Sequence, residues 1–177
     1  ITFAASANCI RYCGGEVVFS DIDSTTYLLD INKVEALLKA APKGTYKGIV
    51  PVDFAGRAVN LEAYRKLADE YDLWILEDSC HSPGGYFVDS NSKNQNCGNG
   101  NYADLAIFSF HPVKHIATGE GGMITTNDDR LADVMSMLRN HGASVSEEQR
   151  HHGPRPYILP DFNMLGFNYR MTDLQGA

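Results

Sequence analysis

The sequence lacks the features that mark several large classes of protein. It contains no run of about 18 apolar residues, the minimum for a membrane-spanning helix. Its net charge of -7 leaves no basic surplus to neutralise phosphates, so neither a nucleic acid nor a membrane is expected as a partner. A few local donors can still bind one small anionic substrate, whatever the total charge.

Cysteine is scarce and is not arranged in pairs. None of Cys9, Cys13, Cys80 and Cys97 forms a C-x-x-C motif, and no repeated His/Cys pair has the spacing of a zinc site. We therefore predict no metal site. Reduced thiols in a cytoplasmic protein are the simplest interpretation, and the cytoplasm is the localisation that we expect.

Both ends of the sequence read as cuts within a longer protein. Residue 1 is Ile rather than Met, and the first residues are too few and too uncharged for a signal peptide. Residues 172–177 predict the beginning of a helix. The length of 177 residues suits one domain. We therefore expect residues 1–177 to be part of one large domain.

Short apolar runs alternate with amphipathic stretches along the chain. The amphipathic spacing predicts a helix after Asp30 and helices over residues 61–71 and 128–138. The apolar runs predict strands over residues 16–20, 46–52, 73–76, 105–110 and 122–126. Residues 89–100 predict a surface loop, and residues 144–161 an irregular segment. The alternation predicts an α/β fold of three α/β/α layers, with a mostly parallel sheet covered on both faces.

Chemically unusual residues follow two of the predicted strands, and functional groups gather at the carboxyl ends of such strands. Ser109 and Lys114 are five residues apart and could bind one small anionic ligand together. A lysine there can form an imine with an aldehyde cofactor, and residues 118–122 supply a glycine-rich turn beside it. The P-loop pattern is absent. Taken alone, Lys114 could equally be a solvated lysine at a strand end.

The second place is the end of the strand predicted over residues 73–76. A carboxylate such as Asp78 could be held against a cationic ring nitrogen, the partner that pyridoxal phosphate needs to act as an electron sink. His81 could face the same ring or donate to its phenolic oxygen. Read singly, Asp78 could also be a helix N-cap, and His81 a surface histidine or a hydrogen-bonded core histidine.

Read together, these segments resemble the DegT/DnrJ/StrS family of pyridoxal-phosphate-dependent sugar-nucleotide aminotransferases of fold type I. The two most specific strings are residues 77–81 (E-D-S-C-H) and residues 108–122 (F-S-F-H-P-V-K-H-I-A-T-G-E-G-G). Further matching strings lie at residues 2–8, 51–56, 139–142 and 166–173. The resemblance runs from end to end, with the motifs in the expected order.

The resemblance implies a role for each residue of the cofactor site. Lys114 would be the catalytic residue, which holds pyridoxal phosphate as an imine and carries the proton between the substrate carbon and the cofactor's C4'. Asp78 would pair with the pyridine nitrogen, and His81 would lie near the phenolic oxygen. Ser109 would bind the phosphate, and Asn168 would reach it from the neighbouring subunit of a homodimer. Arg170 could assist there or be structural.

The resemblance also implies a reaction in two halves. Glutamate would donate its amine to the cofactor, which would pass it to a keto carbon of a nucleotide-linked hexose. Several strings, such as residues 51–56 (P-V-D-F-A-G), are most similar to enzymes that aminate C4 of UDP-linked 4-keto-6-deoxy-N-acetylhexosamines. Those enzymes serve pseudaminic-acid and related surface-sugar pathways.

Two departures and three alternatives accompany this interpretation. The family's phosphate-binding turn upstream and its small C-terminal domain are not in the sequence, so we expect residues 1–177 alone to be inactive.

A sugar dehydratase of the same family would carry histidine in place of Lys114. A regulatory or binding protein would have lost the set of Asp78, His81, Ser109 and Lys114. A plain nucleotide-binding domain would need a glycine-rich turn between a strand and a helix, which the sequence lacks.

Overall fold

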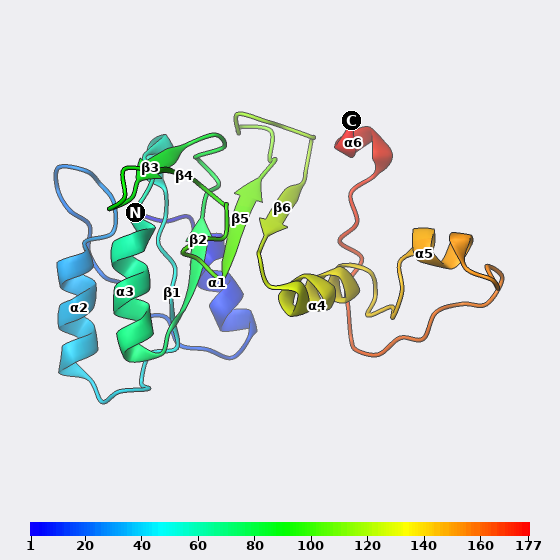
Figure 1. Ribbon diagram of the computed structural model, residues 1–177, viewed down its shortest axis with the longest axis horizontal. Helices are drawn as coiled ribbons and strands as arrows, with labels where there is room; N and C mark the ends of the chain where they lie inside the picture. The colour runs from blue at the N-terminus through cyan, green and yellow to red at the C-terminus, as the bar shows by residue number, and fades with distance from the viewer. The chain divides into compact units, whose positions relative to one another are not determined.

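The computed structural model describes residues 1–177, apart from the side chain of Glu147 (Figure 1). The chain forms two compact units, Ile1–Asn127 and Asp128–Ala177, and each is described by itself. Among the described residues, no helix combines the length and apolar character that crossing a membrane would require.

The first unit is built on a four-stranded sheet in the order β1-β2-β5-β6. Its strands are β1 (Gly48–Ile49), β2 (Trp74–Asp78), β5 (Leu105–Ser109) and β6 (Gly122–Thr125). β1, β2 and β5 are parallel, and β6 runs antiparallel to β5. The predicted α/β class with a mostly parallel sheet is therefore confirmed.

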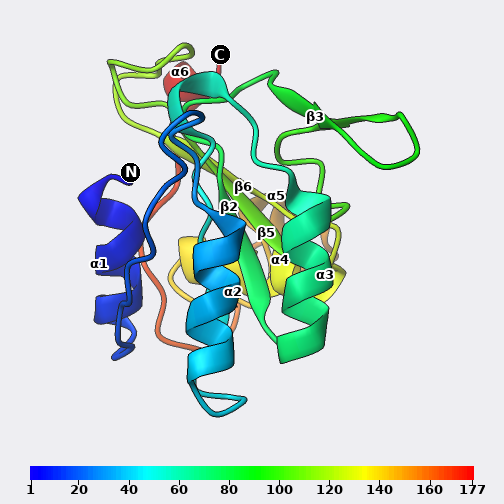
Figure 2. The same ribbon diagram turned by 90° about the vertical axis from the view of Figure 1, so that its left-hand side faces the viewer.

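Two helices, α2 (Ile31–Ala40) and α3 (Leu61–Tyr71), lie side by side on one face of this sheet (Figures 1 and 2). Each begins at a side chain that accepts a backbone N–H, Asp30 for α2 and Asn60 for α3. The apolar residues of α3 recur at helical spacing and are buried, as the sequence predicted. The core comprises Val34, Leu38, Ile49, Val59, Leu61, Tyr64, Leu67, Ala68, Leu73, Ile75 and Ala103.

The prediction of a strand over residues 16–20 is wrong. This segment forms no strand, and Val18 and Phe19 are 55% and 69% exposed. It borders a cavity of about 680 Å³, which α2 and β1 also line. The apolar residues therefore lack the neighbouring strand whose backbone would pair with theirs. β1 is also shorter than the predicted 46–52, although Val52 forms an isolated bridge to Asp78.

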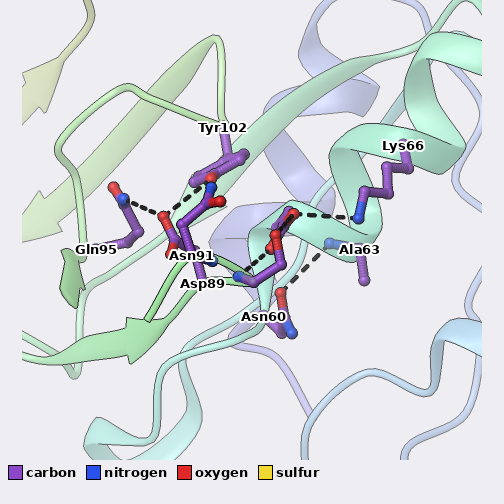
Figure 3. A network of polar contacts seen from close by, with 9 residues as sticks. Asn60, Ala63, Lys66, Asp89, Asn91, Gln95 and Tyr102 are labelled. Carbon is purple, nitrogen blue, oxygen red and sulfur yellow. Dashed lines mark hydrogen bonds and ion pairs between the residues drawn. The ribbon is translucent and has the colours of Figure 1, made fainter. Parts of the chain in front are cut away.

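Residues 89–100, predicted as a loop, contain part of a hairpin of β3 (Tyr86–Val88) and β4 (Asn94–Asn96). Its turn is organised by the buried carboxylate of Asp89 (Figure 3). That carboxylate accepts hydrogen bonds from the backbone of Asn91 and Lys93 and from the side chains of Gln95 and Tyr102. A buried carboxylate with its hydrogen-bond donors therefore organises this hairpin in place of apolar side chains. A search for apolar periodicity cannot detect such a hairpin.

Helix α1 (Ala4–Tyr12) precedes the sheet, and a short 3-10 turn η1 (Phe54–Gly56) follows β1. In the second unit, α4 (Asp129–Arg139) begins at the capping side chain of Asp128. The predicted irregular segment 144–161 contains the short helix α5 (Glu147–His152), and α6 (Asp173–Gly176) ends the chain. α6 begins with a capping box between Thr172 and Gln175.

Candidate active site

Asp78 is the last residue of β2, and its carboxylate is buried, with 4% of the residue exposed. One oxygen accepts the Ser6 hydroxyl at 2.6 Å, and the other accepts the Cys80 N–H at 3.2 Å. No helix begins within residues 79–85, so Asp78 is not a helix N-cap. A buried carboxylate at a strand end, held on both oxygens, can present its remaining lone pairs to a cation.

His81 lies three residues beyond Asp78 and is half-buried. Its Nδ1 accepts the N–H of Ala55 at 3.4 Å, and its ring is 6.0 Å from that of Phe54. Burial lowers the pKa of His81, and the positive charge of Lys114 lowers it further. The imidazole is therefore neutral at neutral pH, and with Nδ1 accepting, the proton lies on Nε2.

Ser109 ends β5, the strand beside β2. Asp78 is paired with Ile107 in the parallel register, so Ser109 lies two residues further along the neighbouring strand. The His111 N–H donates to the Ser109 hydroxyl oxygen at 3.3 Å. The chain then leaves the sheet and returns to β6, and the Thr118 N–H donates to the carbonyl oxygen of Phe110 at 3.0 Å. Residues 111–117 thus form a loop over the strand ends.

Lys114 lies in this loop and is half-buried. Its charge acts on the turn after β2, where it lowers the pKa of both His81 and the Cys80 thiol. The Cys80 pKa is nevertheless raised to about 12, first by burial and then by the hydrogen bond to Asp78 and by its charge. Lys114 therefore belongs to the loop that follows β5, the strand beside β2, and its positive charge reaches the turn of Cys80 and His81.

Asn168 belongs to the second unit. It is exposed and forms an isolated antiparallel bridge with Asn140. Arg170 donates to the side-chain oxygen of Asn140 at 2.6 Å, which gives Arg170 a structural contact within its own unit. The proposed phosphate contact of Asn168 remains a prediction.

Sequence reasoning missed a buried acidic cluster directly behind Asp78. Asp53 is fully buried and accepts hydrogen bonds from the hydroxyls of Ser79, at 3.0 Å, and Ser82, at 2.9 Å. Glu77 accepts the Gly98 N–H at 2.9 Å. Burial, followed by the negative charge of Asp53, raises the pKa of Glu77 to about 7. The alternation of side chains along a strand could have shown that Glu77 and Asp78 face opposite sides.

Ser6 was the other residue missed. Its segment was noted as part of a matching string, but nothing in the sequence connects a serine near the N-terminus to a carboxylate 72 residues away. Only the fold reveals this contact.

The first unit thus combines a mostly parallel sheet with a buried carboxylate and a hydroxyl at neighbouring strand ends and a lysine in the loop that follows. The model of the DegT/DnrJ/EryC1/StrS aminotransferase family matches residues 1–177. The chain belongs to this family. The family is pyridoxal-phosphate-dependent, so the predicted cofactor and enzyme class are confirmed at the level of the family.

Relatives and solved structures agree with this assignment. GDP-perosamine synthase from Caulobacter vibrioides is 38% identical over 177 residues, which cover 100% of this chain and 42% of that protein. PseC from Helicobacter pylori, described as an aminotransferase in the biosynthesis of pseudoaminic acid, has a TM-score of 0.79 and is 32% identical, with 99% of this chain and 42% of that chain covered. NtdA from Bacillus subtilis, solved with bound PMP, has a TM-score of 0.75 and 28% identity, with 98% and 34% covered. The chain thus spans less than half the length of these proteins.

The residues of the first unit fit pyridoxal phosphate by their chemistry. Asp78 has its carboxylate oriented by two donors and can still accept from a ring nitrogen. Ser109 can donate to a phosphate, since its oxygen already accepts the His111 N–H and its own proton is free to rotate. Lys114 supplies the primary amine that reacts with an aldehyde.

Proposed function

We propose that the whole protein is an aminotransferase that uses pyridoxal phosphate to aminate a nucleotide-linked keto-sugar. The observation that supports the proposal is the position of the buried Asp78 at the end of β2, beside the parallel strand β5 that carries Ser109 and leads into the loop of Lys114. The family supports the same chemistry.

Each residue of the site has a definite task in this reaction. When bound, pyridoxal phosphate supplies an electron sink for the pair released as a proton leaves the carbon next to the amine. Lys114 would hold the cofactor through its Nζ, with loss of water from the aldehyde, and its released amine would carry the proton to and from the substrate carbon. The negative charge of Asp78 would favour a protonated ring nitrogen, and the donors Ser6 and Cys80 hold its carboxylate in place.

His81 and Ser109 orient the cofactor. His81 would donate from Nε2 to the phenolic oxygen, since its Nδ1 accepts the Ala55 N–H. Ser109, at the end of β5, would donate to the phosphate. Together, these two contacts would orient the cofactor and leave the amine of Lys114 to carry the proton.

The substrate that we propose is a UDP-linked 4-keto-6-deoxyhexosamine of a surface-sugar pathway, with glutamate as the amino donor. Similarity to PseC supports this sugar class. Similarity to GDP-perosamine synthase means that the nucleotide must be tested directly.

We further propose that residues 1–177 are part of the large cofactor-binding domain and that the protein is a homodimer with shared active sites. Exposed apolar side chains in the second unit support a subunit contact, among them Leu159 at 73% and Leu165 at 91%. In such a dimer, Asn168 would reach the phosphate held by the partner subunit.

The test uses the full-length protein loaded with pyridoxal phosphate. We expect glutamate to convert the bound cofactor to its amine form, seen as loss of the visible absorbance band with release of 2-oxoglutarate. A UDP-linked keto-sugar should then restore the band and yield an amino sugar, identified by mass spectrometry beside its GDP-linked counterpart. A product that has lost a hydroxyl without gaining nitrogen would instead identify a dehydratase, and absence of cofactor binding would identify a binding protein.

A further inference from the structure

Helix α1 makes one buried contact with the candidate active site. Ser6 is the only one of its nine residues that is buried, with 9% exposed, and the rest of α1 is exposed or half-buried. The hydroxyl of Ser6 donates to Asp78 at 2.6 Å across 72 residues of sequence. The helix therefore presents a single polar side chain to the carboxylate at the end of β2.

The geometry of this hydrogen bond is that of a strong one. A length of 2.6 Å is typical of a hydroxyl that donates to an ionised carboxylate, and such bonds are about twice as strong as neutral ones. Both side chains are buried, although Ser6 also borders the cavity beside residues 16–20, and burial strengthens the hydrogen bond between them. Loss of the Ser6 hydroxyl would leave that oxygen of Asp78 without its buried donor.

The backbone of Asp78 is fixed independently of Ser6. Its N–H donates to the Pro51 carbonyl oxygen at 2.9 Å, and its own carbonyl oxygen accepts the Asp53 N–H at 3.0 Å. These bonds hold the main chain but leave the side-chain torsions open. The Cys80 N–H donates to one carboxylate oxygen of Asp78 from two residues along the chain. The hydroxyl of Ser6 donates to the other oxygen, and it comes from a separate element, α1.

We propose that Ser6 is a positioning residue of the cofactor site. Its hydroxyl sets the orientation in which the Asp78 carboxylate meets the ring nitrogen of pyridoxal phosphate, and it links α1 to that contact. The inference rests on the proposed function, since it assigns Ser6 a role toward the cofactor of that site. Ser6 acts through Asp78 and touches no reacting atom.

The test measures the dissociation constant of pyridoxal phosphate for the full-length enzyme and its variants by titration of the apoenzyme. We expect Ser6→Ala to weaken binding on the order of tenfold, the size of a lost hydrogen bond to a charged group. Ser6→Thr keeps the hydroxyl and should restore most of the affinity. Asn8→Ala, an exposed change on the same helix, is the matched control and should bind as the parent does.

A double-mutant cycle with Asp78→Asn distinguishes positioning from a general effect on folding. If Ser6 acts through Asp78, Ser6→Ala should weaken binding much less in the Asp78→Asn enzyme than in the parent. Full additivity of the two losses, or equal affinity of Ser6→Ala and the parent, would overturn the inference and leave the proposed function standing. Failure of the parent itself to bind the cofactor would overturn both. Ser6→Cys, with a similar size and a weaker donor, takes the place of Ser6→Ala in the cycle if the latter fails to fold.

Discussion

Glu77 and Asp78 are neighbours in β2, yet their carboxylates face opposite sides of the sheet and have different partners. Asp78 accepts the hydroxyl of Ser6, whereas Glu77 accepts the N–H of Gly98 and lies beside Asp53. The alternation of side chains along the strand separates them. One carboxylate is thus available to a ligand at the strand end, and the other belongs to a buried acidic cluster beneath it.

The cluster makes stability depend on pH. The pKa of Glu77 is raised from 4.5 to about 7, so between these values the folded chain binds a proton that the unfolded chain has released. The free energy of unfolding therefore decreases as pH rises through this interval. We expect Glu77→Gln, which cannot ionise, to show a smaller fall in Tm over the same range. The exposed change Glu16→Gln should keep the parent's slope. A Glu77→Gln slope equal to the parent's would contradict the raised pKa.

The core on α3 predicts a clear contrast between neighbouring residues. Leu67 is 7% exposed and packs in the core, whereas the Lys66 side chain is 72% exposed and pairs with Glu62 at the surface. We expect Leu67→Ala to lower the free energy of unfolding by about 2–5 kcal/mol, because a cavity remains. Lys66→Ala should cost less than about 1 kcal/mol. Denaturant titrations of both variants measure this contrast, and equal costs would show that α3 packs differently.

Two glycines of the second unit differ in what a side chain would meet. Gly142 has a φ of +81°, and a Cβ there would overlap the carbonyl oxygen of Met164. Gly176 has no atom within 4 Å of such a Cβ. We expect Gly142→Ala to destabilise the unit by about 1–3 kcal/mol through backbone strain, with the overlap adding to it. Gly176→Ala should change stability little. Thermal unfolding compares the two, and a neutral Gly142→Ala would rule out the close approach to Met164.

Removal of the Ser109 hydroxyl should weaken cofactor binding. If Ser109 donates to the phosphate, Ser109→Ala should raise the dissociation constant of pyridoxal phosphate on the order of tenfold. It should affect pyridoxal, which has no phosphate, much less. Ser24→Ala, at an exposed position, is the control for both ligands. An equal loss for the two ligands would place Ser109 away from the phosphate.

The sequence predicted correctly those helices and strands whose local residue pattern matches the surroundings that they have in the folded chain. The apolar spacing of α3 and the capping residue Asp30 are local signals, and the structure keeps them. The segment 16–20 is apolar as a strand should be, but a strand exists only where a partner pairs with it. The hairpin around Asp89 has a polar centre, so apolar periodicity could not detect it.

The residues of the candidate site also fall into two groups, those that the local sequence indicates and those that only the fold reveals. Asp78, His81, Ser109 and Lys114 could be proposed from the sequence because each lies at the end of a recognisable strand or shortly after it, within a short motif. Ser6 and Asp53 were not, because their contacts with residues 77–82 depend on how distant segments fold together. The position of Asn168 relative to the other four stays a prediction.

The most direct test of the central claim is to locate the cofactor on the chain. Full-length enzyme loaded with pyridoxal phosphate is reduced with borohydride, digested and analysed by mass spectrometry. The account predicts a phosphopyridoxyl group on Lys114, no label at that peptide in Lys114→Ala, and unchanged labelling in Lys93→Ala, an exposed lysine of the hairpin turn. A label on another lysine, or no label in the parent under conditions where it binds the cofactor, would contradict the assignment of Lys114.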